Sequence, residues 1–310
     1  MQRIRIGSRK SKLSLWQSNL VAKSLKAIYP SANIEIVEIS TKGDENLNQP
    51  LPEIGGKGLF TEELEKELIS KDIDCAVHSL KDLPTENTPN LILGSILKRA
   101  SVEDVLITKN RNSFSELDKN AKIGTSSLRR SSQLKSINNN LEVLDIRGNV
   151  QTRIQKVLDK SNHYDAIILA KAGVERLNLM KYVDEIFSTE QIVPAPGQGA
   201  IAVQCHQDNK EIFDKLTDET TLMTTTAERS FLEYLGGGCS LPVGAYCKKV
   251  NEHLIITGRV VSLDGKEVVQ VENTSLEIPQ TGRVEFAEEL GKSLAMNALS
   301  NGAKNIMEKI

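Results

Sequence analysis

The chain has 310 residues, with 39 basic against 41 acidic side chains and a formal net charge of −2. This length predicts two or three domains with a sizeable core, and the balanced charge argues against a general nucleic-acid-binding surface. No apolar run approaches a membrane span and the first residues lack a secretion signal, so we expect a soluble cytoplasmic protein. The four histidines and four cysteines show no metal-ligand spacing, which argues against a metal site.

The first two hundred residues alternate short apolar runs with helical periods, a pattern typical of α/β folds. The predicted strands cover 3–6, 34–39, 74–78, 102–108, 121–124, 141–146 and 165–170, and the predicted helices cover 12–28, 59–70, 128–137, 150–158 and 172–177. Because the pattern restarts near residue 102, we expect two similar α/β units with a cleft between them, where strand ends and helix N-termini meet. The prolines and glycines of 193–199 predict a crossing segment that returns strand 200–204 to the first unit.

From Thr221 onward the pattern changes to that of a small α+β domain. A helix over 225–235, three strands over 244–248, 254–262 and 267–271, and a final helix over 283–297 are expected. Asp264-Gly265 supplies good chemistry for the turn between the last two strands. The predicted domains are therefore 1–97 together with 198–217, then 98–197, and finally 218–310.

The run Gly236-Gly237-Gly238-Cys239-Ser240-Leu241-Pro242 has the composition of a shaped loop. Glycines permit positive φ and close approach of a ligand, and Pro242 lacks an N–H. Such a loop suits the display of a reactive or derivatised thiol at Cys239. The alternative is a buried apolar cysteine, which is the usual place for a free thiol.

Arginine is unusually frequent at the predicted strand ends and turns. The arginines in question are Arg9, Arg129, Arg130, Arg147, Arg153 and Arg176. Thr125-Ser126-Ser127 lies between a strand and a helix, so its hydroxyls and free N–H groups are placed to meet an anion beside Arg129 and Arg130. Since the planar guanidinium fork matches carboxylates, these residues predict a small polyanionic ligand, although any single arginine is also compatible with a solvated surface charge.

Two further segments are candidates for chemistry. The apolar strand ending at His78 runs directly into Ser79, Lys81 and Asp82, and Asp82 is the candidate acid-base or charge-stabilising residue; the alternative is a turn cap before Pro84. The glycine-rich run 55–61 does not have P-loop spacing. It is either a hinge that brings Lys57 and Phe60 over the cleft or a loop with an apolar anchor.

Taken in order, these segments resemble the porphobilinogen deaminase family, also called hydroxymethylbilane synthase, across essentially the full chain. The resemblance rests on seven motifs, at 7–11, 55–60, 76–82, 124–130, 146–150, 196–200 and 236–239. It implies a monomeric three-domain transferase of heme biosynthesis whose first two domains are similar to periplasmic binding proteins. Its implied reaction condenses four porphobilinogen molecules head to tail, with release of ammonia and finally of hydroxymethylbilane.

The resemblance also implies roles for individual residues. It implies a dipyrromethane cofactor bound by thioether to Cys239, with Asp82 as the catalytic residue that stabilises the azafulvene cation formed on loss of ammonia. Cofactor binding is implied for Ser11, Lys81, Thr125, Ser127, Arg129, Arg130 and Arg147, and substrate binding for Arg9, Ser79, Arg147, Arg153, Arg176, Phe60 and Lys57. Each pyrrole ring carries two carboxylates, which accounts for the arginines at the turns.

The chain departs from the family pattern at two positions. Glu53 stands where many members have lysine, and Lys171 replaces a residue that is usually small or apolar. The remaining cysteines, Cys75, Cys205 and Cys247, are interpreted as structural. Two other readings stay open from the residues: a binding protein for a small polycarboxylate without turnover, and an enzyme acting on phosphates or nucleotides.

Overall fold

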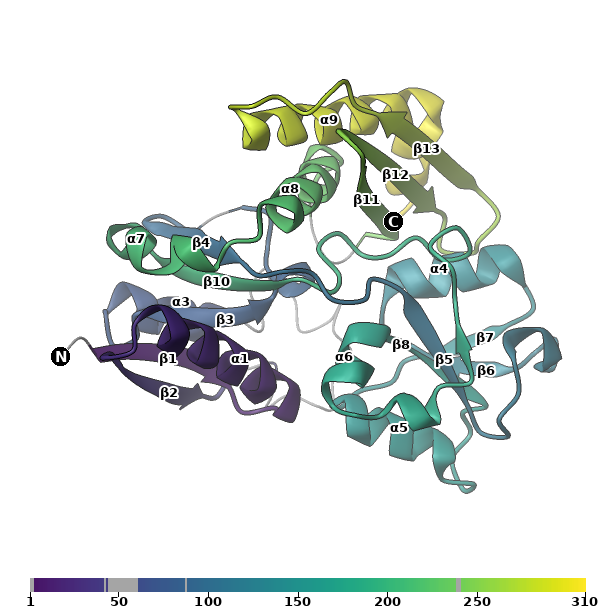
Figure 1. The fold of residues 1–310 in the computed structure, drawn as a ribbon. Helices are drawn as coiled ribbons and strands as arrows, with labels where there is room; N and C mark the ends of the chain where they lie inside the picture. The colour runs from purple at the N-terminus through teal and green to yellow at the C-terminus, as the bar shows by residue number, and fades with distance from the viewer. Residues whose placement is uncertain (1–2, 42, 44–60, 87, 238–240) are drawn as a thin grey trace.

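We describe the fold from a computed structural model, for residues 3–41, 43, 61–86, 88–237 and 241–310. The predictions for Glu53, Lys57, Phe60 and Cys239 therefore lie outside the described residues. Figure 1 shows three units, one on the left built mainly from the first hundred residues, one on the right from the second hundred, and one above them from the last ninety. Among the described residues, no helix is both long and apolar enough to cross a lipid bilayer.

The first unit is a five-stranded sheet in the order β2-β1-β3-β10-β4. Its strands are β1 (Arg3–Arg9), β2 (Asn33–Ile39), β3 (Cys75–Ser79), β4 (Leu91–Ile96) and β10 (Ile201–His206). β1 pairs in parallel with β2 and β3, whereas β10 is antiparallel to both β3 and β4. The helices of this unit are α1 (Lys12–Ile28), α3 (Glu62–Ile69) and the short α7 (Lys210–Phe213).

The second unit repeats this topology in the order β7-β6-β8-β5-β9. Its strands are β5 (Asp104–Thr108), β6 (Lys122–Gly124), β7 (Glu142–Leu144), β8 (Ala166–Ala170) and β9 (Glu185–Ile186), and its helices are α4 (Leu128–Ile137), α5 (Val150–Leu158) and α6 (Lys171–Arg176). β6 is parallel to β7 and β8, and β5 is antiparallel to β8 and β9. The expected pair of similar α/β units is therefore confirmed.

In each unit the antiparallel fourth strand comes from the segment that has just crossed over from the other unit. The crossing from β4 to β5 covers 97–103, and the return from β9 to β10 covers 187–200, so strand β10 rejoins the first sheet as predicted. The two crossings meet at Gly199, which has φ +89° and accepts a hydrogen bond from Ala100 N at 3.2 Å. A Cβ on Gly199 would lie 2.6 Å from Ser101 O and 2.7 Å from Ala100 O, so glycine is required there.

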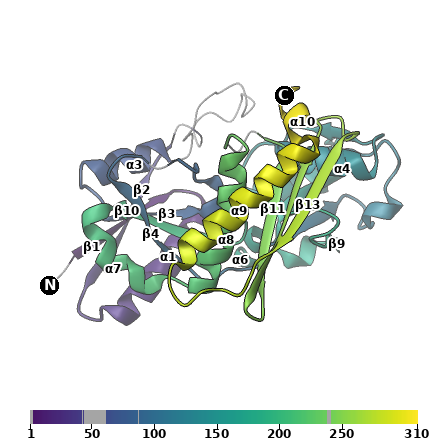
Figure 2. The same cartoon turned by 90° about the horizontal axis from the view of Figure 1, so that it is seen from above.

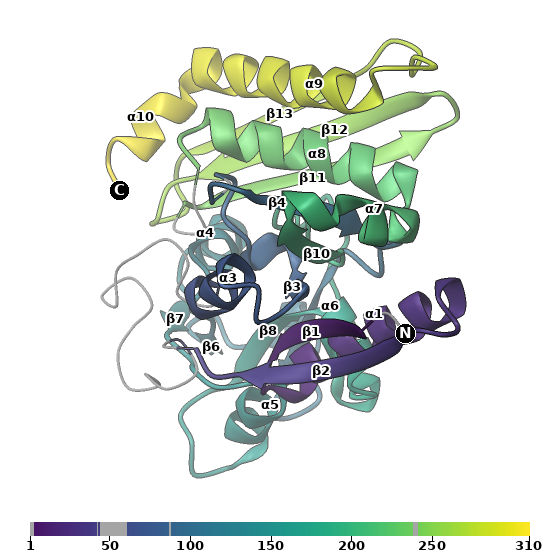
Figure 3. The same cartoon turned by 90° about the vertical axis from the view of Figure 1, so that its left-hand side faces the viewer.

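The third unit packs two long helices on one three-stranded antiparallel sheet, with an apolar core between them. Its elements are α8 (Glu219–Tyr234), β11 (Val243–Val250), β12 (His253–Val261), β13 (Val268–Thr274), α9 (Arg283–Ala298) and α10 (Lys304–Met307). Figures 2 and 3 show α8 and α9 lying side by side. Gly291 allows this approach, since a Cβ there would collide with Ala227 O on α8. The predicted small α+β unit is confirmed.

Some predicted boundaries were wrong. α8 begins at Glu219, six residues before the predicted start at Thr225, because Asp218 caps it by accepting a hydrogen bond from Thr221 N at 2.8 Å. The threonines that obscured this helix satisfy their hydroxyls within it, as Thr225 Oγ1 donates to Thr221 O at 2.7 Å. Strands β4 and β9 were not predicted at all.

Candidate active site

Asp82 lies at the point where the first sheet gives way to a single tight turn. β3 ends at Ser79 and is followed by the 3₁₀ turn η1 (Leu80–Asp82), whose first residue is fully buried. Leu80 anchors the turn by donating its N–H to Ala200 O at 3.0 Å. Because the apolar residue of the turn points into the core, Asp82 is left exposed and Lys81 half-buried.

Ser79 is oriented from helix α1. Its Oγ accepts a hydrogen bond of 2.8 Å from Nε2 of Gln17, a side chain that is itself buried. His78, one residue earlier, is also buried, and burial lowers its pKa to about 4, helped by the positive charge of Arg9. His78 is therefore neutral near pH 7, and the charges beside this strand end belong to Lys81 and Asp82.

The N-terminus of α4 brings two of the predicted arginines into the interior. Ser127 is the N-cap residue, and its own N–H is 3.2 Å from Thr125 Oγ1. Arg129 and Arg130 are only 3% and 6% exposed. Both pair with one carboxylate, that of the fully buried Asp104 at the start of β5, with Nη1 of Arg129 at 2.8 Å and Nη2 of Arg130 at 2.7 Å.

Arg147 and Arg153 flank the N-terminus of α5 in the same unit. Arg153 Nε donates to Gly148 O at 2.7 Å, and Lys156 Nζ donates to Arg147 O at 3.1 Å. The pKa of Arg153 is lowered to about 10, mainly by burial and in part by the positive charges of Arg130 and Arg147. The charges of Arg130, Arg147 and Arg153 therefore lie near enough to influence one another.

Charged side chains of the first and second units influence one another near Asp82. Burial lowers the pKa of Lys81 to about 8, and the positive charge of Arg130 in the second unit contributes to this shift. The Asp82 carboxylate opposes the lowering for both Lys81 and Arg153, so it interacts with cations on either side. We call Lys81, Arg129, Arg130, Arg147 and Arg153 the cationic cluster, and Asp82 is the exposed carboxylate in its field.

Gln198, in the second crossing segment, joins the two halves of this cluster. Its Oε1 is 3.3 Å from Lys81 Nζ in the first unit, and its Nε2 donates to Asp104 Oδ1 at 3.1 Å and to Val102 O at 2.7 Å. Neither Gln198 nor Asp104 was predicted from the sequence to be a site residue. A signal for Asp104 was present, since an acidic residue that opens the apolar run of β5 needs a buried cationic partner.

Other predicted site residues lie at the contact of α1 with α6. Ser11 caps α1 by accepting a hydrogen bond from Ser14 N at 3.1 Å, and Arg9 is the last residue of β1. Arg176 donates to Gly199 O at 2.7 Å, and its guanidinium lies 5.6 Å from the ring centroid of Trp16 on α1. Burial lowers the pKa of Arg176 to about 10. Arg176 thus bridges the first unit, the second unit and a crossing segment.

Lys171, one of the departures from the family pattern, begins α6. Its ammonium is 3.5 Å from Glu103 Oε1 and 3.9 Å from Glu175 Oε1. Its positive charge is therefore balanced by two local carboxylates, and it adds little to the cationic cluster.

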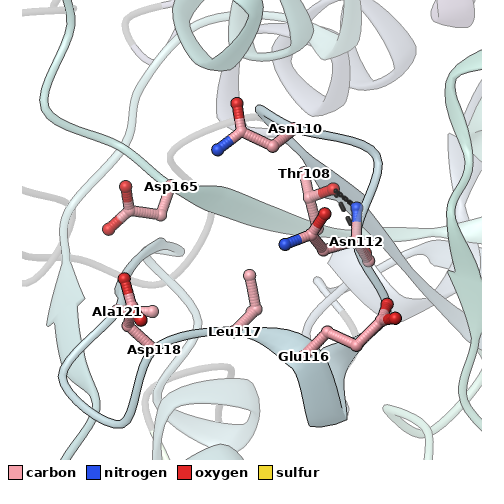
Figure 4. A pocket seen from close by; sticks show the side chains of 8 residues that line it. All are labelled: Thr108, Asn110, Asn112, Glu116, Leu117, Asp118, Ala121 and Asp165. Atoms are coloured by element: carbon pink, nitrogen blue, oxygen red, sulfur yellow. Dashed lines mark hydrogen bonds between the residues drawn. The ribbon is translucent and has the colours of Figure 1, made fainter.

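Figure 4 shows a small polar pocket in the second unit that contains none of the predicted site residues. It is lined mainly by carboxylates and amides, and the carboxylates belong to Glu116, Asp118 and Asp165. Within the described ranges, no group of three or more histidine, cysteine or acidic side chains is arranged to hold a metal ion. An acidic pocket repels a polycarboxylate, so the candidate active site is the cationic cluster.

The donor set of the cluster fits a ligand with several carboxylates. Asp104 supplies one buried negative charge to two buried arginines, which leaves positive charge in excess. Arg129 Nε is buried without a hydrogen-bond partner within the described part of the chain. Burial is the main cause of the lowered pKa values of Lys81 and Arg153, and the positive charge of Arg130 adds to both shifts.

Comparison with known proteins decides the family. The model described as "Porphobilinogen deaminase, dipyromethane cofactor binding domain" matches residues 4–214, and "Porphobilinogen deaminase, C-terminal domain" matches residues 222–300. The chain belongs to the porphobilinogen deaminase family. The dipyrromethane cofactor is thus a property of the family domain that contains the whole cationic cluster.

Curated relatives agree over their whole length. A porphobilinogen deaminase of Natranaerobius thermophilus is 43% identical over 311 residues, covering 99% of both chains, and that of Bacillus subtilis is 41% identical over 315 residues, covering 100% of this chain and 97% of its own. Among solved structures, a TRAP periplasmic solute binding protein from Desulfovibrio desulfuricans covers 72% of this chain and 78% of its own at 9% identity with a TM-score of 0.42. The fold of the two α/β units follows from the order and pairing of the strands in this chain.

Proposed function

We propose that the cationic cluster and Asp82 carry out the reaction of the porphobilinogen deaminase family in this chain. The reaction joins porphobilinogen units head to tail, releases ammonia at each step, and yields hydroxymethylbilane for tetrapyrrole biosynthesis. When bound, the dipyrromethane supplies the pyrrole carbon to which the first unit is joined. We place this protein in the cytoplasm as a monomer, with Cys239 as the point of covalent attachment.

The cluster residues have different binding roles according to their position. Lys81, Arg129 and Arg130, with the hydroxyls of Ser11, Thr125 and Ser127, hold the cofactor carboxylates. Arg147 and Arg153, at the start of α5, are shared with incoming substrate, as are Arg9, Ser79 and Arg176 at the α1 side. Lys57 and Phe60 complete the substrate set. Each carboxylate that enters relieves repulsion among buried cations, so binding is favoured by the charge already present.

Asp82 has the chemical role. Loss of ammonia from porphobilinogen leaves positive charge on the pyrrole, and an ionised carboxylate near the ring N–H stabilises that charge as it develops. Asp82 is exposed at the end of a 3₁₀ turn, which supports a carboxylate that is available to a ligand and not buried in the core. The assignment is supported by the position of Asp82 between the two units, where its negative charge raises the pKa of Lys81 in one unit and of Arg153 in the other.

The division into domains is part of the proposal. Residues 1–97 with 198–217 and residues 98–197 form the two lobes that hold the cluster, and residues 218–310 carry the cysteine loop. Because each lobe receives its antiparallel strand from a crossing segment, a change in lobe separation must bend 97–103 and 187–200 together. This coupling supports a cleft that widens as a unit when rings are added.

The test is the Asp82→Asn variant, with Asp214→Asn as a matched control on an exposed carboxylate of η5 (Asp214–Leu216). We expect Asp82→Asn to keep the fold and the attached cofactor, measured by circular dichroism and intact mass, while ammonia release falls by about 100-fold or more. Asp214→Asn should retain native turnover. Near-native turnover in Asp82→Asn would refute the role of Asp82. A purified chain without added mass would refute cofactor attachment and, if it also showed no turnover, would favour a polycarboxylate-binding protein.

A further inference from the structure

Arg229, on helix α8 of the third unit, donates two hydrogen bonds to the backbone immediately after Asp82. Its Nη2 donates to Pro84 O at 2.7 Å and its Nη1 donates to Leu83 O at 3.1 Å. These two carbonyls belong to the first and second residues after the catalytic carboxylate. The contact joins segments 145 residues apart in sequence, so it is set by the tertiary fold and not by the local turn.

The two bonds fix the direction of the backbone at this point. Arginine offers two parallel N–H donors in a rigid plane, whereas lysine offers a single ammonium. The turn itself is closed by Leu83 N donating to Leu80 O at 3.2 Å, and before Asp82 it is held by Leu80 N donating to Ala200 O at 3.0 Å. Arg229 thus secures the C-terminal side of a turn whose N-terminal side is bonded to Ala200, at the end of the return crossing segment.

The glycines that follow α8 contact the same segment a second time. Gly237 has φ +59°, and a Cβ built on it would lie 3.0 Å from Thr85 Oγ1. The helix ends just before, where Gly237 N donates to Leu232 O at 2.9 Å and Gly236 N donates to Glu233 O at 2.9 Å. Residues 83–85 therefore lie along α8 from Arg229 to its C-terminal glycines.

α8 is itself held rigidly where Arg229 leaves it. The adjacent Glu228 is fully buried, and its carboxylate accepts hydrogen bonds from Nη1 and Nη2 of Arg99 at 2.7 and 2.8 Å. It also accepts Gly197 N at 2.7 Å and Cys247 N at 2.8 Å. One carboxylate thus joins α8 to both crossing segments and to β11. These bonds hold α8 in place next to Arg229.

We propose that Arg229 is a positioning residue that acts through Asp82. By holding the carbonyls of Leu83 and Pro84, it keeps the Asp82 carboxylate in place while the occupants of the cluster change. This inference rests on the proposed role of Asp82. Misplacement of a reacting group by about 1 Å can cost about 100-fold in rate, so the effect of losing Arg229 is expected in kcat, with KM largely unchanged.

The experiment is a double-mutant cycle between Arg229→Gln and Asp82→Asn, read as kcat and KM from steady-state ammonia release. We expect Arg229→Gln to lower kcat by about 10- to 100-fold in the native background and by less than about twofold when Asp82 is already Asn, because residues that act as a unit are not additive. Arg229→Lys, which keeps one donor, should lie between the native enzyme and Arg229→Gln and serves if Arg229→Gln does not fold.

The matched control is Arg283→Gln, which removes another arginine of the third unit that donates to a backbone carbonyl, that of Pro279 at 3.1 Å. It should leave kcat unchanged. Hydrogen exchange should increase in the peptide 80–86 of Arg229→Gln and not of Arg283→Gln, with the cofactor mass retained in both. An equal loss of rate in both Asp82 backgrounds, or native kcat in Arg229→Gln, would overturn the proposal, whereas native turnover in Asp82→Asn alone would overturn the proposed function instead.

Discussion

Asp104 is the residue whose replacement tests the buried charge arrangement most clearly. Its carboxylate is fully buried and accepts from Arg130 Nε at 3.0 Å and Nη2 at 2.7 Å, from Gln198 Nε2 at 3.1 Å, and faces Arg129 Nη1 at 2.8 Å. The Asp104→Asn variant keeps the shape and removes the charge. Two buried guanidinium groups then lose their counter-ion, and removal of one partner of a buried pair costs about 3–5 kcal/mol.

Asp74→Asn is the matched control. Asp74 makes a similar set of bonds to Arg5, at 2.7, 3.0 and 3.2 Å, but both side chains are partly exposed. Solvent screens that pair, so we expect its loss to cost about 1 kcal/mol or less. Urea unfolding, followed by circular dichroism and by the fluorescence of the single tryptophan, Trp16, measures the free energy of unfolding for both variants.

The difference between the two variants should be about 2 kcal/mol or more at pH 7. The neighbouring arginines hold the pKa of Asp104 well below its ordinary value. A carboxyl with a lowered pKa stabilises the fold above its unfolded pKa of about 3.9, and that stabilisation is lost as the pH falls further. An Asp104→Asn variant no less stable than Asp74→Asn at pH 7 would refute the charge argument.

Two further predictions concern other parts of the same framework. The pKa of Lys81 is lowered to about 8, so between about pH 8 and 10.4 the unfolded chain binds a proton that the folded chain does not, and the free energy of unfolding should rise with pH in this window. In a Cys239→Ser background, this rise should be smaller when Lys81 is replaced in Lys81→Met. Identical pH profiles of unfolding for Cys239→Ser with and without Lys81→Met would contradict the prediction. Gly199→Ala places a Cβ 2.6 Å from Ser101 O at positive φ. We therefore expect the free energy of unfolding to fall by several kcal/mol, with little folded protein by circular dichroism. A native melting temperature would disprove the close approach of the two crossing segments.

The regular elements of the fold were largely predictable because their signals are local. Apolar periodicity indicated α1, α4, α5 and α9 close to their observed bounds, and the Asp264-Gly265 turn of the last hairpin is confirmed, with Gly265 at φ +79° and its N–H donating to Ser262 O. The strand β4 has an apolar sequence that carried the same kind of signal. Its Gly94, which reads as a strand breaker, is there because a Cβ would lie 2.6 Å from Cys205 Sγ.

The candidate site was predictable in its residue types and not in its pairings. Frequent arginine at strand ends indicated a polyanion, but nothing local shows that Arg129 and Arg130 share Asp104 from a strand more than twenty residues earlier. The contact of Arg229 with Leu83 and Pro84 is longer in range still. Such pairings depend on how the units pack, and a single sequence does not encode them in any local pattern.

The central claim is that this chain holds a dipyrromethane covalently within a cluster of cations. The most direct measurement is the intact mass of the purified native chain beside that of Cys239→Ser. We predict that the native chain is heavier than its sequence by one dipyrromethane, and that Cys239→Ser has the mass of its sequence and forms no hydroxymethylbilane from porphobilinogen. An unmodified native chain that still forms this product, or a Cys239→Ser variant with full activity, would contradict the account.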